Sequence, residues 1–390
     1  MYDSINFIQG TNFYMNLYCF LLYCFLLLVS LRGNVANIYV KESNGFSAIL
    51  LFLGILLFSL TSFVDDDFFH YYEYMSEFRG HVIDDDNVGV ETFYQYLIQF
   101  INGDYFLFRL IVWGGGLIFT VLATRKFGAN VYHTLFVILA GFIMTFSYAR
   151  ATLAMAVFSL GVAMICVINE RGFLKKIVPT ILGWIVVACS IYFHRSLLPL
   201  VAIAILWSFV PGKHSLTKHA LLLFPLFVIV VALVLKIGFE ELAMVANSWN
   251  DDETGTLDKM EHYRTMEGSR YNFNGYISLA LKYSSFYLPF VLIANAFRSE
   301  QVRLMVGNKG IRLFMVTYFI FVLATSFLFI GFDSSVLFYR YLFMSFIPLS
   351  ILVAYMKDVG ALKKIHYLWI IICLIMNSLL QLFGAVYNQM

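Results

Sequence analysis

Charged residues are scarce in this chain. Asp, Glu, Lys and Arg make up only 13% of its 390 residues, whereas 61% are hydrophobic. Globular proteins average about 25% charged and about 45–50% apolar residues, and no soluble domain of this size can bury so much apolar surface. The composition therefore excludes a soluble protein and predicts a polytopic membrane protein.

Other absences narrow the function further. The cysteines lie inside apolar runs without the spacing of a zinc site or a disulfide framework, and clusters of His and Cys are missing. No stretch is both basic and soluble, so nothing indicates binding to nucleic acid. The first twelve residues contain no Lys or Arg, so the basic start of a cleavable signal peptide is absent. The run 13–31 is therefore expected to remain as the first membrane anchor.

Apolar runs of about 20 residues, the length that crosses a bilayer as a helix, recur along the chain. Alternating strand patterns are absent, so every run is expected to be helical. The seventh run is short, which helix tilt or local thinning of the bilayer can absorb. About twelve spans are predicted: 13–31, 46–64, 104–123, 131–149, 151–168, 177–193, 196–210, 219–238, 275–297, 313–332, 336–356 and 366–386.

The loops between these runs alternate in charge. Cytoplasmic loops are rich in Lys and Arg, so the cation-rich set is placed in the cytoplasm and both termini are placed outside. Sixteen of the 26 cations fall in this set: Arg32, Lys41, Arg125, Lys126, Arg171, Lys175, Lys176, Lys213, Lys218, Arg298, Arg303, Lys309, Arg312, Lys357, Lys363 and Lys364.

Two larger loops are predicted on the outer face. Loop 65–103 is acidic and aromatic, and residues 91–101 within it form an amphipathic pattern typical of a helix that lies in the membrane interface. Asn102-Gly103 is expected to end that helix. Loop 239–274 mixes acidic residues with three cations. Gly-Ser-rich linkers and sustained repeats are not visible, so residues 1–390 are predicted to form a single integral membrane domain.

A run of three glycines, Gly114-Gly115-Gly116, lies within the third predicted span. A phosphate-binding loop would need a following Lys-Ser/Thr and a strand-to-helix context, and both are missing. Close packing of two helices is the expected role of these glycines.

Three arginines lie on the outer face, where cations are usually scarce. Arg150 and Arg195 fall between two apolar runs with almost no loop to separate them, and Arg340 follows a predicted outer turn at 333–335. Guanidinium groups bind phosphate bidentately. Three of them on separate hairpins therefore indicate that the protein binds an anion outside the cytoplasm. The plainer alternatives are a snorkelling Arg150 that contacts lipid phosphate and an Arg340 that anchors the aromatic belt.

Four further residues could take part in proton transfer. His194 adjoins Arg195 at a corner between two spans, where it could hold an anion or move a proton near neutral pH. The alternative is a turn histidine that hydrogen-bonds to the backbone. Asp65, Asp66 and Asp67 could include a general base, hydrogen-bond sugar hydroxyls or hold a divalent metal. The alternative for these acids is a solvated charge run.

Tyr71, Tyr72 and Tyr74 follow this acidic run and offer flat faces of the kind that stack on sugar rings. Glu91 stands at the start of the predicted interfacial helix. It could also contact a sugar, although capping its own helix is the simpler interpretation.

The order of these motifs resembles the EpsG-like branch of the Wzy-type bacterial polysaccharide polymerases. The chain departs from the family pattern at Ala151, where glutamine is usual after the arginine, and at Arg195, where a small residue usually follows the histidine. The segments that carry the resemblance are DDDFFHYY at 65–72, VETFY at 90–94, YARATLAMA at 148–156, FHRS at 193–196 and YRYL at 339–342.

This resemblance implies a membrane-embedded glycosyltransferase of the GT-C type in the bacterial inner membrane. Such an enzyme moves a growing glycan from its undecaprenyl diphosphate carrier to a new lipid-linked repeat unit on the periplasmic side, making O-antigen or a related surface polysaccharide. It implies no nucleotide sugar, no metal and no other cofactor, and a chain-length regulator as a possible partner. Arg150, Arg195 and Arg340 would then bind the diphosphates, and His194 or one of residues 65–67 would act as base.

Other functions stay open at this point. A flippase for lipid-linked oligosaccharides would also have about twelve spans, but repeat symmetry and charges near the bilayer midplane would be expected of it. A polysaccharide ligase uses the same lipid diphosphate donor, so the arginines do not exclude it. An enzyme that acylates sugars and a purely structural membrane protein are further alternatives.

Overall fold

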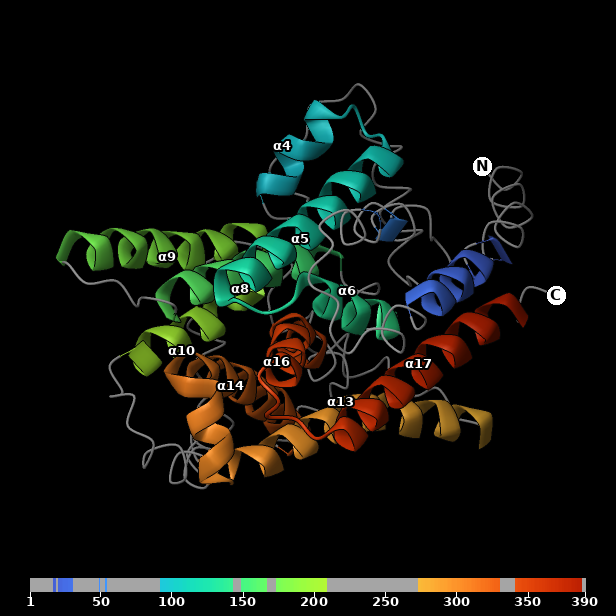
Figure 1. The fold of residues 1–390 in the computed structure, drawn as a ribbon. Helices are drawn as coiled ribbons and strands as arrows, with labels where there is room; N and C mark the ends of the chain where they lie inside the picture. The colour runs from blue at the N-terminus through green and yellow to red at the C-terminus, as the bar shows by residue number, and fades with distance from the viewer. Residues whose placement is uncertain are drawn as a thin grey trace.

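The computed structural model describes residues 17–18, 20–30, 49, 53–54, 92–142, 149–166, 173–208, 273–329 and 341–387 (Figure 1). These residues form helices, and no strand occurs among them, as the composition predicts. After an apolar helix at Phe20–Ser30, the elements are α4 (Thr92–Phe100), α5 (Tyr105–Phe127), α6 (Val131–Ala140), α8 (Ala149–Cys166), α9 (Phe173–Phe193), the 3-10 turn η2 (Arg195–Leu197), α10 (Leu198–Ser208), α13 (Phe273–Phe297), α14 (Glu300–Phe329), α16 (Phe346–Asp358) and α17 (Lys364–Tyr387).

Three helices in the described ranges are long and apolar enough to cross a membrane. They are Tyr105–Phe127, Glu300–Thr325 and Tyr341–Asp358. Six shorter apolar helices accompany them, and the predicted run 219–238 lies outside the described residues. The number of twelve spans therefore stays a prediction, whereas the apolar, helical character of the described residues is confirmed.

Two helix boundaries differ from those predicted. α14 begins at Glu300, so most of the segment 298–312, predicted as a loop because of its cations, is helical. Its backbone departs from helical geometry only at Gly307 (φ 61°, ψ −176°), a conformation that glycine adopts readily. α8 begins at Ala149, which places Arg150 inside the first turn of a helix rather than in a connection.

The helix ends that the charge pattern assigns to the cytoplasm lie together. Lys309 Nζ donates to the carbonyl oxygen of Phe127 at 2.8 Å and lies 4.8 Å from the centre of the Tyr355 ring. Asp358 accepts from the backbone N–H of Asn130 at 2.7 Å and contacts His133 Nδ1 at 2.6 Å. This end gathers the close of α5, the start of α6, the kink of α14 and the close of α16. These four helices therefore run in the relative directions that the charge pattern predicts, although the side of the membrane itself stays a prediction.

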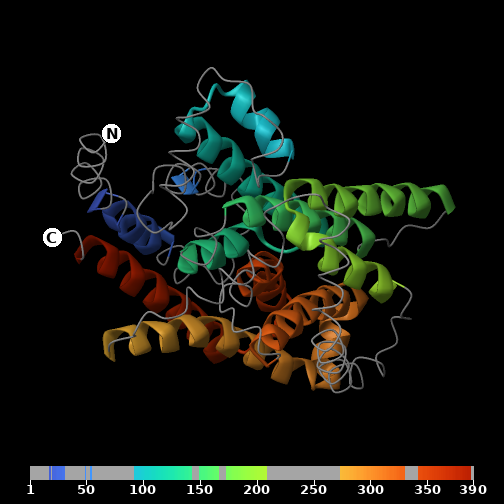
Figure 2. The ribbon, with the colours of Figure 1, turned by 180° about the vertical axis from the view of Figure 1, so that it is seen from behind.

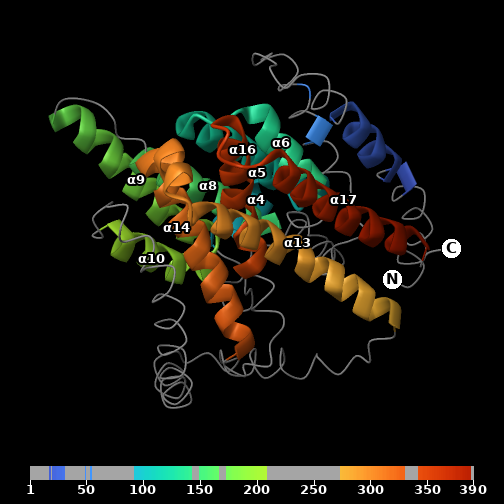
Figure 3. The ribbon, with the colours of Figure 1, turned by 60° about the horizontal axis from the view of Figure 1, so that its bottom comes forward.

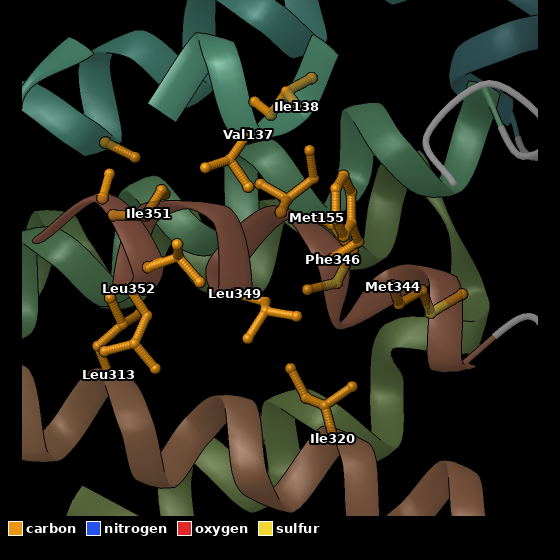
Figure 4. Close-up of a cluster of buried hydrophobic side chains, with 14 of the residues drawn as sticks. Val137, Ile138, Met155, Leu313, Ile320, Met344, Phe346, Leu349, Ile351 and Leu352 are labelled. Atoms are coloured by element: carbon orange, nitrogen blue, oxygen red, sulfur yellow. The ribbon is translucent and has the colours of Figure 1, made fainter. Parts of the chain in front are cut away.

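α16 forms the centre of the main hydrophobic core. Every residue from Phe346 to Met356 is buried. Figure 4 shows Leu349 and Leu352 of α16 between α6 above and α14 below. The peripheral helices α13 and α17 lie side by side (Figure 3). A central helix that is apolar all round fits a position surrounded by other helices.

Small residues let three helices approach closely around α8. A Cβ added at Gly116 of α5 would lie 3.7 Å from the Cα of Leu153, so the glycine run of α5 packs against α8 as predicted. A Cβ added at Gly161 of α8 would lie 2.8 Å from the carbonyl oxygen of Gly183 in α9. Such contacts through small residues are typical of helix packing in membranes.

Candidate functional site

Two consecutive residues of α4 join the start of α8 to the end of α9. The Tyr94 hydroxyl donates to the carbonyl oxygen of Arg150 at 3.3 Å, and the guanidinium carbon of Arg150 lies 5.9 Å from the centre of the Tyr94 ring. The ring of Phe93 packs edge-on against Phe193, with 4.6 Å between ring centres. Because Phe193 directly precedes His194, α4 brings Arg150 and the His194 corner to the same end of the molecule.

A second, smaller hydrophobic core supports this arrangement. α4 begins within the range over which an amphipathic helix is predicted, and one of its faces is buried while Tyr96 and Phe100 on the other are exposed. Figures 1 and 2 show α4 lying over the start of α5. The buried members of this core come from α4, the turn that follows it, α5 and α8, and they are Tyr94, Ile98, Ile101, Phe108, Val112, Leu153 and Val157.

His194 and Arg195 form a corner with no spacer, as their sequence position predicts. α9 ends at Phe193, and His194 takes an extended backbone (φ −162°, ψ 110°) before η2 begins. The His194 N–H donates to the carbonyl of Ser190, and its own carbonyl accepts from Leu197. The imidazole does not cap η2. Backbone hydrogen bonds therefore contribute to holding the corner, with His194 half-buried and Arg195 exposed.

The packing of α8 against α9 also places Arg150 and His194 at one end. The two helices are antiparallel and approach most closely at Gly161 and Gly183. Arg150 lies eleven residues before Gly161, and His194 lies eleven residues after Gly183. Equal steps in opposite chain directions lead to the same end of an antiparallel pair. The hairpin and the contacts of α4 thus agree on the position of both residues.

A third segment reaches the corner through Tyr341. Its hydroxyl donates to the carbonyl oxygen of Ser196 at 3.0 Å. Ser196 follows Arg195, and Tyr341 follows Arg340. This hydrogen bond therefore joins the chain positions next to two of the three predicted arginines, although Arg340 itself lies outside the described residues.

Replacing Tyr341 by phenylalanine should slow a reaction that depends on the Arg195 corner, without unfolding the protein. One hydrogen bond contributes about 1 kcal/mol, so looser placement of the Arg195 corner should lower the rate by up to about tenfold. Tyr355→Phe is the matched control, because its hydroxyl donates to the Val306 carbonyl at 3.1 Å at the opposite end of the same segment. Thermal unfolding would be measured for both variants, together with the initial rate of the glycan transfer that the family resemblance implies. Equal rates in the two would contradict a positioning role for Tyr341.

The remaining predicted site residues lie outside the described part of the chain. Their proposed roles in proton transfer, anion binding and sugar binding therefore stay predictions. They are Asp65, Asp66, Asp67, Tyr71, Tyr72, Tyr74, Glu91 and Arg340. Among the residues that are described, no three His, Cys, Asp or Glu side chains lie close enough together to hold a metal ion.

A further arginine, which was not among the predicted site residues, is buried in the structure. Arg109 lies near the start of α5 and is only 3% exposed. Its guanidinium carbon lies 5.7 Å from the centre of the Tyr105 ring. The signal was present in the sequence, since Arg109 falls inside a predicted span, and an ionisable residue there is a site candidate by default.

Comparison with known proteins assigns most of the chain to one family. The model of the EpsG family matches residues 45–389. A search of curated proteins found no match. A search of solved structures found none either.

Proposed function

The chain belongs to the EpsG family, and on this basis we propose that it is a glycosyltransferase that polymerises lipid-linked oligosaccharide repeat units. Family membership and the apolar helices support a membrane protein of polysaccharide biosynthesis. The finer proposal is a GT-C-type polymerase of the bacterial inner membrane. It uses undecaprenyl-diphosphate-linked substrates and makes O-antigen or a related surface polysaccharide at the periplasmic face.

The proposed reaction transfers a glycan between two carriers. A hydroxyl oxygen of the acceptor repeat unit attacks the anomeric carbon of the growing chain. The new glycosidic bond forms as the bond from that carbon to the diphosphate oxygen breaks, and undecaprenyl diphosphate leaves as the anion. The hydroxyl proton passes to a base, for which His194 and Asp65, Asp66 or Asp67 are the candidates.

The observation that carries this proposal is the joint placement of Arg150 and the His194–Arg195 corner by α4. A diphosphate leaving group gains negative charge as the bond breaks, and fixed guanidinium groups stabilise that charge. A proton acceptor at the same end would serve the attacking hydroxyl. One end of the molecule thus offers both cations for the leaving group and a candidate base for the attacking hydroxyl.

The position of these groups favours a polymerase over a transporter. Transporter sites lie near the bilayer midplane, often at broken helices. Arg150 lies in the first turn of α8, and Arg195 follows the last turn of α9. Both arginines therefore lie at helix ends, where an enzyme acting at the membrane surface needs them.

Deletion of the gene, followed by gel analysis of surface glycan, tests the proposal directly. Loss of a polymerase should leave single repeat units attached and remove the ladder of longer chains. Loss of a flippase would remove repeat units from the surface altogether, and loss of a ligase would leave polymer on the carrier lipid. Either of the latter patterns would contradict polymerisation. Co-purification would then test the chain-length regulator expected as a partner.

A further inference from the structure

Three aromatic rings connect Arg109 with Arg150. The rings of Tyr105 and Phe108 are stacked with 6.5 Å between centres, and Phe108 lies 5.9 Å from Tyr94. One arginine lies at each end of this row, with Arg109 5.7 Å from the Tyr105 ring and Arg150 5.9 Å from the Tyr94 ring. The row thus joins the two arginines through rings of α4 and α5.

Helix packing also places Arg109 near the start of α8. Arg109, Trp113 and Gly116 fall on one stripe of α5, at spacings of four and three residues. Gly116 meets α8 at Leu153, so this stripe faces α8. α5 and α8 run in the same direction, because Tyr94 contacts the first turn of each. Arg109 is seven residues before Gly116, and Arg150 is three before Leu153, an axial offset of roughly 6 Å.

Arg109 is a buried cation near the start of an apolar helix. Arginine is rarely found inside an apolar span, and where it occurs it commonly marks a pathway or site for a charged ligand. An anion bound between two guanidinium groups in a medium of low dielectric constant would be stabilised by both. A guanidinium group can place its flat face against an aromatic ring. Its N–H groups, which lie in the guanidinium plane, then remain available to oxygen ligands.

We propose that Arg109 is a fourth anion-binding arginine, which together with Arg150 recognises the diphosphate of the lipid-linked substrate. This inference rests on the proposed function and adds to it a residue and a selectivity. Two separate guanidinium groups favour two linked phosphates over one, so the site should distinguish a lipid diphosphate from a lipid monophosphate. Burial gives Arg109 less contact with bulk water than the exposed Arg195, and hence a stronger interaction with a bound anion.

Lipid binding by the purified full-length protein tests this proposal. Undecaprenyl diphosphate, undecaprenyl monophosphate and dioleoylphosphatidylglycerol would each be titrated by native mass spectrometry. Arg109→Gln should weaken diphosphate binding by about 10-fold to 100-fold, as expected for loss of charge-assisted hydrogen bonds. Binding of the other two lipids should change less than about threefold, because one phosphate can be held by Arg150. Arg125→Gln, exposed at the far end of the same helix, is the matched control.

The possible results separate this inference from the proposed function. If the wild-type protein does not prefer the diphosphate, the proposed function fails. If it does prefer the diphosphate and Arg109→Gln binds it equally well, the assignment of Arg109 alone is wrong. Equal losses for all three lipids would make Arg109 a general lipid contact and also overturn the assignment. Should Arg109→Gln not fold, Arg109→Lys keeps the charge without the bidentate fork and should lose the preference for diphosphate over monophosphate.

Discussion

Replacing Arg150 by alanine is expected to turn a ladder of long glycans into single repeat units, with a transfer rate lower by about 10²–10³-fold. The guanidinium would stabilise charge that develops on the diphosphate as the glycosidic bond breaks, and its removal leaves that charge less well compensated. The fold should survive, because the Tyr94 hydroxyl bonds to the backbone oxygen of Arg150. Alanine retains that oxygen and favours a helix.

The controls for Arg150 separate charge from geometry. Arg150→Lys keeps the charge but loses the planar fork, so its rate should fall between those of alanine and wild type. Arg125→Ala removes an exposed arginine at the opposite end and should leave the ladder unchanged. Gel analysis of surface glycan and the rate of the purified protein give independent measurements. A normal ladder from Arg150→Ala in well-folded protein would show that Arg150 does not serve the reaction.

The relative directions of the helices could be predicted from the sequence, because cation-rich connections are expected on the same side of the membrane. Cations cluster at alternate connections, and Lys309 and Asp358 indeed lie at one end of the described helices. The absence of any loop at Arg195 likewise predicted a tight corner. Both predictions depend on residues that are close together in the sequence. A charged connection or a missing spacer restricts the local course of the chain.

Features that depend on tertiary packing could not be predicted in the same way. The cations between residues 298 and 312 favoured a loop. The segment is instead helical from Glu300, and its Lys309 contacts the end of α5. The contact between Tyr94 and Arg150 joins residues 56 positions apart. No local pattern specifies such a partner, and the row of rings leading to Arg109 likewise depends on how α4 lies across α5.

α4 is the element on which the candidate site depends. Its buried face belongs to the smaller hydrophobic core, separate from the main core around α16. Phe93 of α4 contacts the end of α9, and Tyr94 of α4 contacts the start of α8. A short helix that lies across others has little stability of its own. Its packing against the ends of these spans therefore fixes the site, and substitutions in it should affect transfer before they affect the main core.

Replacing His194 by alanine is expected to lower the transfer rate by about 10²–10⁴-fold if the imidazole is the base. The corner itself should persist, because the bonds from His194 N–H to Ser190 and from Leu197 to the His194 carbonyl involve only backbone atoms. The side chain also does not cap η2. A loss of rate with unchanged thermal unfolding would thus report chemistry rather than damage to the fold.

Chemical rescue can separate a proton acceptor from a positioning residue at His194. Added imidazole should restore part of the rate of His194→Gly, because a free base can enter the space that the side chain leaves, whereas it should not affect Arg150→Ala. His366→Ala, on α17 at the predicted cytoplasmic end, is the matched histidine control. If His194→Ala retains most of the rate while Asp65→Asn, Asp66→Asn or Asp67→Asn loses it, the base lies in the acidic segment. His194 would then be left with anion binding, a role that asparagine or glutamine at this position could partly fulfil through an N–H donor.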